Sequence, residues 1–330
     1  MKLPYASVAV VGTGRLLPEV VCCLLQAGHH VQLSELSSCG VDLSILSDGA
    51  LSGEALEEIG NRLELVAEIT ALSPVDLVIL ITPEDLQTKR ESLQAISRIV
   101  PEDAVLAVNT ESFSLEELWG DCAHTGRIIG LNWVRPAHVT LFAEVIATSD
   151  TPTDLLEQMM YLLEKHWNKD PYVVYGGRSI RSRLLAAMIR EAFFLVEQGY
   201  VGVEDIDRAC RNDAGYYMPF AGNLRYMDLM GTNVYGVVME DLNKELATDQ
   251  NLPSFFQNIF QENPYPGMES GKGFYGYEQG AGNLEEKNLL VFAQKIRALM
   301  DRFPFPRDKQ SENEAAVKES MPFTHKNRSL

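Results

Sequence analysis

The stretch SVAVVGTGRLLPEVVCCLLQAGHHVQLSE, residues 7–35, decides the fold of this chain. It opens with a short β-branched run that ends in a Gly-Thr-Gly turn. An apolar segment that contains proline near its start and ends at glycine follows this turn. A second extended run then ends on a glutamate. This order predicts a strand, a glycine turn, a helix and a second strand beside the first.

The glycine turn and the terminal glutamate predict a dinucleotide site. Gly12 and Gly14 let the backbone approach a pyrophosphate at the helix N-terminus, and Glu35 stands where a carboxylate binds the ribose hydroxyls. A carboxylate there favours NAD, because it would repel the 2′-phosphate of NADP. Leu17 occupies the third glycine position of the motif and is expected to push the helix away from the strand. The alternative is an ordinary strand-to-helix turn that binds no ligand.

Two further strands are expected at 75–81 and 104–108, with helical periodicity over 85–99 between them. Repeated strand–helix units of this kind predict a doubly wound parallel sheet. Glu84 and Asn109 would follow the carboxyl ends of these strands, where ligands bind in open α/β sheets. Capping of the next helix is the alternative role for each side chain.

The second half of the chain has the pattern of helices. Apolar residues recur at helical spacing over 182–198, Gly199 ends this run, and a capped helix start follows at 203–209. The predicted fold is therefore an α/β N-terminal Rossmann-type doubly wound sheet followed by an all-α C-terminal domain. The expected parts are a Rossmann-type NAD-binding domain at 1–175, a helical domain at 176–306 and a mobile polar tail at 307–330.

Composition narrows the class of protein. The 330 residues are 46% apolar, enough for two ordinary cores, and no apolar run is long enough to span a bilayer. The net charge of -18 argues against nucleic-acid or anionic-membrane partners. Because no segment is apolar enough to span a bilayer, a cytoplasmic location is expected. Five cysteines without CxxC spacing indicate neither a disulfide framework nor a metal site.

Several motifs together resemble the 3-hydroxyacyl-CoA dehydrogenase family. GLNWVRPAHVTLFAE at 130–144 is similar to the family's active-site strand and loop, and VEDIDRA at 203–209 and GKGFYGY at 271–277 are similar to segments of its C-terminal domain. The resemblance covers about residues 1–280. It implies an oxidoreductase that passes hydride between C3 of a 3-hydroxyacyl substrate and NAD, with the helical domain forming a homodimer.

The resemblance also implies roles within the site. Glu84, Lys89 and Asn109 match residues that lie around the nicotinamide half of NAD in the family. Glu144 matches the glutamate that orients the catalytic histidine, but Asn132 stands at the position of that histidine. An amide has no useful basicity near neutral pH, so Asn132 can hold a substrate oxygen but cannot accept its proton.

Other positions of the expected pocket also depart from the family pattern. Glu111 replaces a serine that meets the substrate, Ser182 replaces a substrate-binding asparagine, and Arg135 replaces another asparagine. A helix N-cap or an exposed polar site is the alternative role for Ser182. His138 stands at a second histidine position of the family, as a structural residue or a substitute base. The segment that follows the second strand is short for the hairpin that clamps CoA in the family, which leaves acyl-CoA binding open.

These observations leave three functions to be distinguished. The first is an NAD-dependent 3-hydroxyacyl-CoA dehydrogenase-like enzyme with weak or altered activity, since loss of the general base costs roughly 10²–10⁴ in rate. The second is a non-catalytic relative that binds NAD and serves as a binding or scaffold protein. The third is an oxidoreductase on a different hydroxy acid, with Arg135 paired to a carboxylate.

Overall fold

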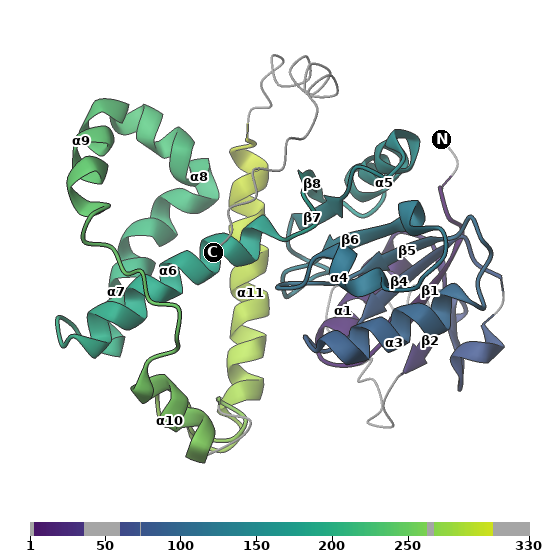
Figure 1. Cartoon of the computed structure of the whole chain (residues 1–330), viewed down its shortest axis with the longest axis horizontal. Helices are drawn as coiled ribbons and strands as arrows, with labels where there is room; N and C mark the ends of the chain where they lie inside the picture. The colour runs from purple at the N-terminus through teal and green to yellow at the C-terminus, as the bar shows by residue number, and fades with distance from the viewer. Residues whose placement is uncertain (1–2, 36–59, 73, 263–266, 306–330) are drawn as a thin grey trace. The chain divides into compact units, whose positions relative to one another are not determined.

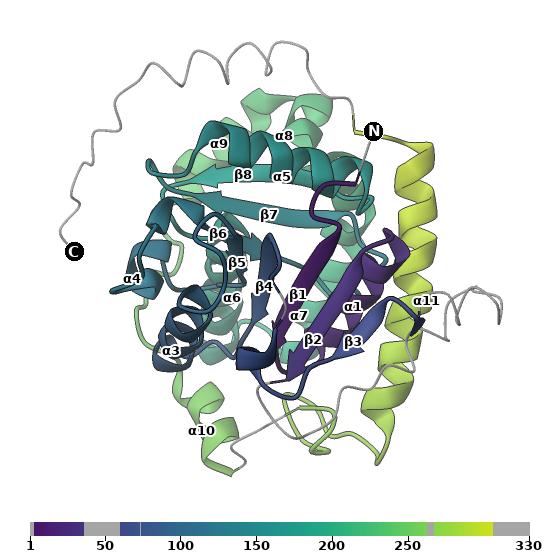
Figure 2. The ribbon, with the colours of Figure 1, turned by 90° about the vertical axis from the view of Figure 1, so that its right-hand side faces the viewer.

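The structure is a computed structural model that describes residues 3–35, 60–72, 74–262 and 267–305. Within these residues, eight strands form one sheet in the order β3-β2-β1-β4-β5-β6-β7-β8, and every neighbouring pair is parallel except β6 and β7 (Figure 2). The strands are β1 (Ser7–Gly12), β2 (His30–Glu35), β3 (Leu63–Leu65), β4 (Leu77–Ile81), β5 (Val105–Val108), β6 (Ile128–Asn132), β7 (Phe142–Ala147) and β8 (Asp170–Tyr175).

Helices cover both faces of this sheet. Apolar side chains of α1 and α5 join one buried cluster with the sheet, and those of α3 and α4 join the other (Figure 2). Short 3-10 turns, η2 and η3, complete this part of the chain. The bounds are α1 (Leu16–Gln26), η2 (Ile69–Ala71), α3 (Leu86–Ser97), α4 (Leu115–Trp119), η3 (Thr125–Arg127) and α5 (Thr153–Lys165).

The unit formed by β1, α1 and β2 confirms the predicted strand–turn–helix–strand order. Gly12 lies opposite Glu35 in the parallel ladder, so the glycine turn and the carboxylate share one edge of the sheet. A Cβ at Gly12 would lie 1.9 Å from the carbonyl oxygen of Ile81, which no side chain can tolerate. Leu17 is fully buried in the cluster under α1, so the core accommodates the side chain at the third glycine position.

The strands and the helix expected over 75–108 are confirmed as β4, α3 and β5. Both β4 and β5 are buried along their whole length, as expected for parallel strands covered on both faces. The strands β7 and β8 and the helix α5 were not predicted. They matter for the site, because β7 pairs antiparallel with β6 and brings Glu144 opposite Asn132.

The described residues divide into two compact units, one made of those within 3–200 and 247–297, the other of those within 201–246 and 298–305. The helix expected over 182–198 is confirmed as α6, and the start expected at 203–209 as α7 (Figure 1). The bounds of these elements are α6 (Ile180–Glu197), α7 (Val203–Ala209), the π-helical η4 (Cys210–Ala214), α8 (Gly215–Met230), α9 (Thr232–Leu242), α10 (Ser254–Glu262) and α11 (Ala281–Arg302).

Two expectations lie outside the described residues. These are the polar tail at 307–330 and most of the segment between β2 and β3, on which the expectation about CoA binding rests. None of the described helices combines the length and the apolar composition that crossing a membrane requires.

Candidate active site

The turn after β1 forms an open cradle of backbone groups. Gly14 has φ +90°, and a Cβ there would meet no atom within 4 Å, so its backbone faces open space. Arg15, the N-cap residue of α1, makes no side-chain cap hydrogen bond. In the first turn of the helix the Leu17 N–H donates to the Gly14 carbonyl oxygen at 3.2 Å, and the Leu16 N–H remains to bind an anion. Glu35 ends β2 at the same edge of the sheet. These residues fit the diphosphate and a ribose of a dinucleotide.

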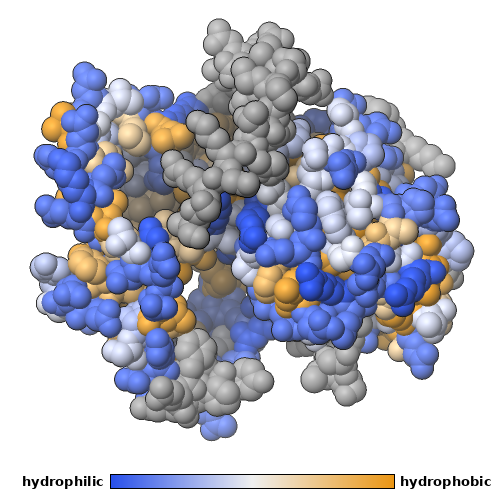
Figure 3. Space-filling view, viewed as in Figure 1, coloured by the Kyte–Doolittle hydropathy of each residue, from blue (hydrophilic) through white to orange (hydrophobic). Residues whose placement is uncertain are grey.

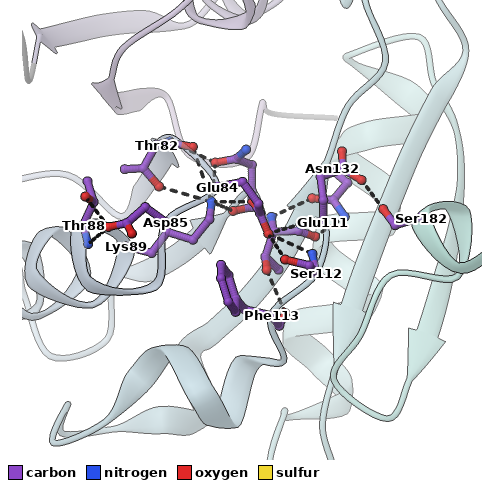
Figure 4. A network of polar contacts seen from close by, with 12 residues as sticks. Thr82, Glu84, Asp85, Thr88, Lys89, Glu111, Ser112, Phe113, Asn132 and Ser182 are labelled. Atoms are coloured by element: carbon purple, nitrogen blue, oxygen red, sulfur yellow. Dashed lines mark hydrogen bonds and ion pairs between the residues drawn. The ribbon is translucent and has the colours of Figure 1, made fainter. Parts of the chain in front are cut away.

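A buried lysine organises the next strand ends. The side chain of Lys89 on α3 is 0% exposed, and its Nζ donates to the backbone oxygen of Asn109 at 2.7 Å (Figure 4). It also pairs with Glu84 at 3.1 Å. The Asn109 side-chain oxygen accepts the backbone N–H of Thr82 at 3.0 Å. Lys89 thus contacts both Glu84 and Asn109, the other two residues predicted to lie near the nicotinamide.

Glu84 connects this lysine to the loop after β5. Its Oε1 accepts the backbone N–H groups of Glu111 at 3.0 Å and Ser112 at 2.8 Å. Burial alone would raise the pKa of Glu84, but the Ser112 N–H and the Lys89 charge outweigh it and hold that pKa below its ordinary value. The capping alternative applies to Asp85 instead, which accepts the Thr88 N–H at the start of α3. Glu84 is therefore ionised and fixes the loop.

Three polar side chains lie in a row across β6, β7 and β8. Asn132 is paired with Glu144 in the antiparallel ladder, and Glu144 is paired with Tyr172 in the next one. Directly opposed residues project from the same face of a sheet, so the three side chains meet. Asn132 Nδ2 donates to Glu144 Oε2 at 3.0 Å, and the Tyr172 hydroxyl donates to Oε1 at 3.0 Å. Burial, and then the Glu144 charge, raise the pKa of Tyr172, which keeps this hydroxyl protonated.

The amide of Asn132 is fully engaged. Besides the bond to Glu144, its Nδ2 donates to the Thr110 carbonyl oxygen at 2.7 Å, and its Oδ1 accepts the Thr110 N–H at 2.8 Å. The residue is 1% exposed. Both amide hydrogens are used, so Asn132 ties the end of β5 to the β6–β7 pair and has no hydrogen left to donate to a substrate oxygen.

Glu144 anchors the start of α6. It is 0% exposed, and its Oε1 accepts the backbone N–H groups of Ile180 and Arg181, each at 3.1 Å. A carboxylate at a helix N-terminus satisfies N–H groups that have no partner inside the helix, and it interacts favourably with the helix dipole. With four donors around it, Glu144 holds the helix and has no exposed oxygen.

The carboxylate of Glu111, the residue after Thr110, also contacts the first turn of α6. Arg181 Nη1 donates to both oxygens of Glu111, at 3.0 and 2.8 Å. The Ser182 hydroxyl also donates to Glu111 Oε2 (Figure 4). The Ser182 N–H in turn donates to the Ser179 hydroxyl, so Ser179 is the N-cap residue of α6. The capping alternative for Ser182 is therefore wrong.

Two family profiles show the family to which the chain belongs. The profile described as 3-hydroxyacyl-CoA dehydrogenase, NAD binding domain, matches residues 7–177, and the profile of the C-terminal domain of the same family matches residues 180–277. The chain belongs to the 3-hydroxyacyl-CoA dehydrogenase family. It is a member of a family of NAD-dependent oxidoreductases, and its cofactor is NAD.

Individual relatives are distant in sequence. A 3-hydroxyadipyl-CoA dehydrogenase of Escherichia coli is 28% identical over 325 residues, which cover 94% of this chain and 66% of that protein. A 5-formyl-3-hydroxy-2-methylpyridine 4-carboxylate 5-dehydrogenase of Mesorhizobium japonicum is 25% identical over 306 residues, which cover 88% of this chain and 97% of that one. The crystal structure of a 5-formyl-3-hydroxy-2-methylpyridine 4-carboxylic acid 5-dehydrogenase has the same fold, with a TM-score of 0.76 and 23% identity, and the match covers 91% of this chain and 98% of that one.

The remaining predicted residues lie apart from this 3-hydroxyacyl-CoA dehydrogenase network. Among the described residues, the buried Nδ1 of His138 has no hydrogen-bond partner. Burial, and then the Lys169 charge, lower the pKa of His138. Arg135, expected to bind a substrate anion, is paired with Glu19 at 2.8 Å.

Two functional contacts were not predicted from the sequence. Tyr172 was not considered, although the valine and tyrosine residues of the DPYVVY segment around it are of the types enriched in strands. The pairing of Arg181 with Glu111 was also unexpected, because the two residues are 70 positions apart. No local signal predicts such a pair.

Proposed function

We propose that this chain is a 3-hydroxyacyl-CoA dehydrogenase-like oxidoreductase with weak or altered activity. The supporting observation is the closed hydrogen bonding of Asn132 with Thr110 and Glu144. A general base must present a lone pair with useful basicity to the substrate hydroxyl, and a buried amide with both hydrogens donated does not. The rate expected without that base is roughly 10²–10⁴ below that of a complete site.

The chain's own residues then bind and orient the reactants. Gly12 and Gly14 hold the diphosphate, and Glu35 accepts hydrogen bonds from a ribose. Lys89 and Glu84 fix the loops beside the nicotinamide. Bound NAD⁺ supplies the hydride acceptor. Orientation alone lowers a barrier by several kcal/mol, so a site with this scaffold retains some turnover without a strong base.

The substrate class is the finer part of the proposal. We propose a 3-hydroxyacyl substrate, such as an acyl-CoA, because both domain profiles match. A different hydroxy acid is the second candidate, since one relative is named for a hydroxylated pyridine carboxylate. The engagement of Arg135 with Glu19 and Glu286 argues against this arginine as the carboxylate site of such a substrate.

We also propose that a helical C-terminal domain, residues 176–306, forms a homodimer and that the protein acts in the cytoplasm. Apolar side chains stand exposed on α8 and α9, and Figure 3 shows apolar surface on these helices. The most exposed are Tyr216 at 81%, Leu224 at 78% and Leu229 at 67%. Exposed apolar surface of this kind marks a protein interface.

The test measures cofactor binding and turnover separately. The parent chain is titrated with NAD⁺ by calorimetry and then assayed for NADH formation with 3-hydroxybutyryl-CoA at high protein concentration. Saturable binding with slow NADH formation supports the proposal. Binding without turnover of either the acyl-CoA or a hydroxy acid favours the scaffold alternative. Absence of NAD⁺ binding contradicts every function considered.

A further inference from the structure

A partly exposed carboxylate adjoins the closed amide of Asn132. Glu111 directly follows Thr110, whose backbone N–H and C=O hold that amide. The side chain of Glu111 is 37% exposed, whereas Asn132 is 1% exposed and Glu144 0% exposed. Of the three carboxylates that hold these loops, Glu111 is the most exposed, ahead of Glu84 at 32% and Glu144.

The carboxylates of Glu84, Glu111 and Glu144 differ in how many further hydrogen bonds they can accept. Glu144 accepts from four donors and has no accessible surface. Glu84 pairs with Lys89, and it accepts hydrogen bonds from the Glu111 N–H and from the N–H and the hydroxyl of Ser112. An ionised carboxylate offers about four lone-pair sites, and Arg181 and Ser182 are two donors to Glu111. Glu111 retains capacity to accept a further hydrogen.

We propose that Glu111 is the proton acceptor of this site, and that Ser182 relays the proton to it. The inference rests on the proposed dehydrogenase function. As the substrate C–H bond breaks, its electron pair leaves as hydride to NAD⁺ and the carbinol carbon becomes a carbonyl. The hydroxyl proton passes to Glu111, either directly or by way of the Ser182 oxygen, which releases its own proton to Glu111. The carboxylic acid then returns the proton to water.

The surrounding charges define how well this base works. Arg181 compensates the negative charge that Glu111 brings, and its backbone N–H is fixed by Glu144. Among the described residues, Lys89 and Tyr172 also interact electrostatically with Glu111. A carboxylate is intrinsically a weaker base than an imidazole, and a weaker base gives a slower proton transfer. A relocated base of this kind agrees with slow turnover.

The first experiment compares Glu111→Gln with Glu116→Gln, which removes a carboxylate from the exposed side of α4. Both variants are assayed with NAD⁺ and 3-hydroxybutyryl-CoA, and NADH binding is titrated as a check on folding. Glu111→Gln is expected to lower kcat roughly 10²-fold with KM and NADH affinity unchanged, and Ser182→Ala about tenfold. Glu116→Gln is expected to match the parent.

Chemical rescue distinguishes a proton acceptor from a positioning residue. Acetate added to Glu111→Ala should restore part of the lost kcat and have no effect on the parent. Loss of turnover without rescue overturns the inference, because Glu111 would then only position Arg181 and Ser182. A Glu111→Gln variant as fast as an active parent overturns it and leaves the proposed function intact. A parent with no turnover overturns both.

Discussion

Replacement of Asn132 by alanine tests whether this residue holds the sheet together. The change removes the bonds to the Thr110 N–H, the Thr110 carbonyl and Glu144 Oε2. Thr110 and Glu144 are each 0% exposed, so all three groups lose a partner away from solvent. A buried polar group without a partner costs roughly 1–3 kcal/mol. Glu144 keeps three other donors and a water can enter the vacated space, so we expect a loss of about 4 kcal/mol, in the lower half of the summed range.

The loss is measured by urea unfolding followed by tryptophan fluorescence. The three tryptophans are Trp119, Trp133 and Trp167, so the signal reports on the sheet and its flanking helices. Asn61→Ala is the control, because Asn61 is exposed and its replacement should change the unfolding free energy by less than about 0.5 kcal/mol. A loss below about 1 kcal/mol for Asn132→Ala would refute the structural role given to this amide.

Three further outcomes are expected. His29 is buried between the Trp167 N–H and the Tyr5 carbonyl, and burial lowers its pKa to about 4. Folding therefore favours the neutral form of His29. About 3 kcal/mol of the unfolding free energy present above pH 6.5 should be lost as the pH falls towards 4. In urea titrations at each pH, His29→Asn should make the unfolding free energy depend less on pH over this range. Glu35→Ala should weaken NAD⁺ binding about tenfold and weaken NADP⁺ binding less, measured by calorimetry; an equal effect on both would exclude a ribose contact. Gly12→Ala should lower the melting temperature and abolish NAD⁺ binding, because its Cβ would overlap the Ile81 carbonyl; unchanged binding would contradict the cradle.

The local parts of the fold could be predicted from the sequence. The unit at 7–35 is marked by β-branched runs, a glycine turn and helical periodicity, all of which act within a few residues. The twelve-residue interval between Asn132 and Glu144 predicted that the two residues lie close together, and the antiparallel pair of β6 and β7 places them opposite each other.

Contacts between distant segments could not be predicted in the same way. Arg135 pairs with Glu19, 116 positions away, and with Glu286, 151 positions away, and its residue type alone suggested a substrate anion instead. The closure of Asn132 onto Thr110 likewise depends on how β5 and β6 lie side by side. Such pairings are set by the packing of the whole sheet, and no periodicity in the sequence encodes them.

The most direct test of the account is the rate of NADH formation by Asn132→His relative to the parent, with 3-hydroxybutyryl-CoA as substrate. An imidazole at this position can donate one nitrogen hydrogen to Glu144 and present the other nitrogen as a base. The account predicts a rise of roughly 10²-fold or more, with NAD⁺ affinity unchanged. An Asn132→His chain that folds, binds NAD⁺ and is no faster than the parent would contradict the claim that the missing base limits this site.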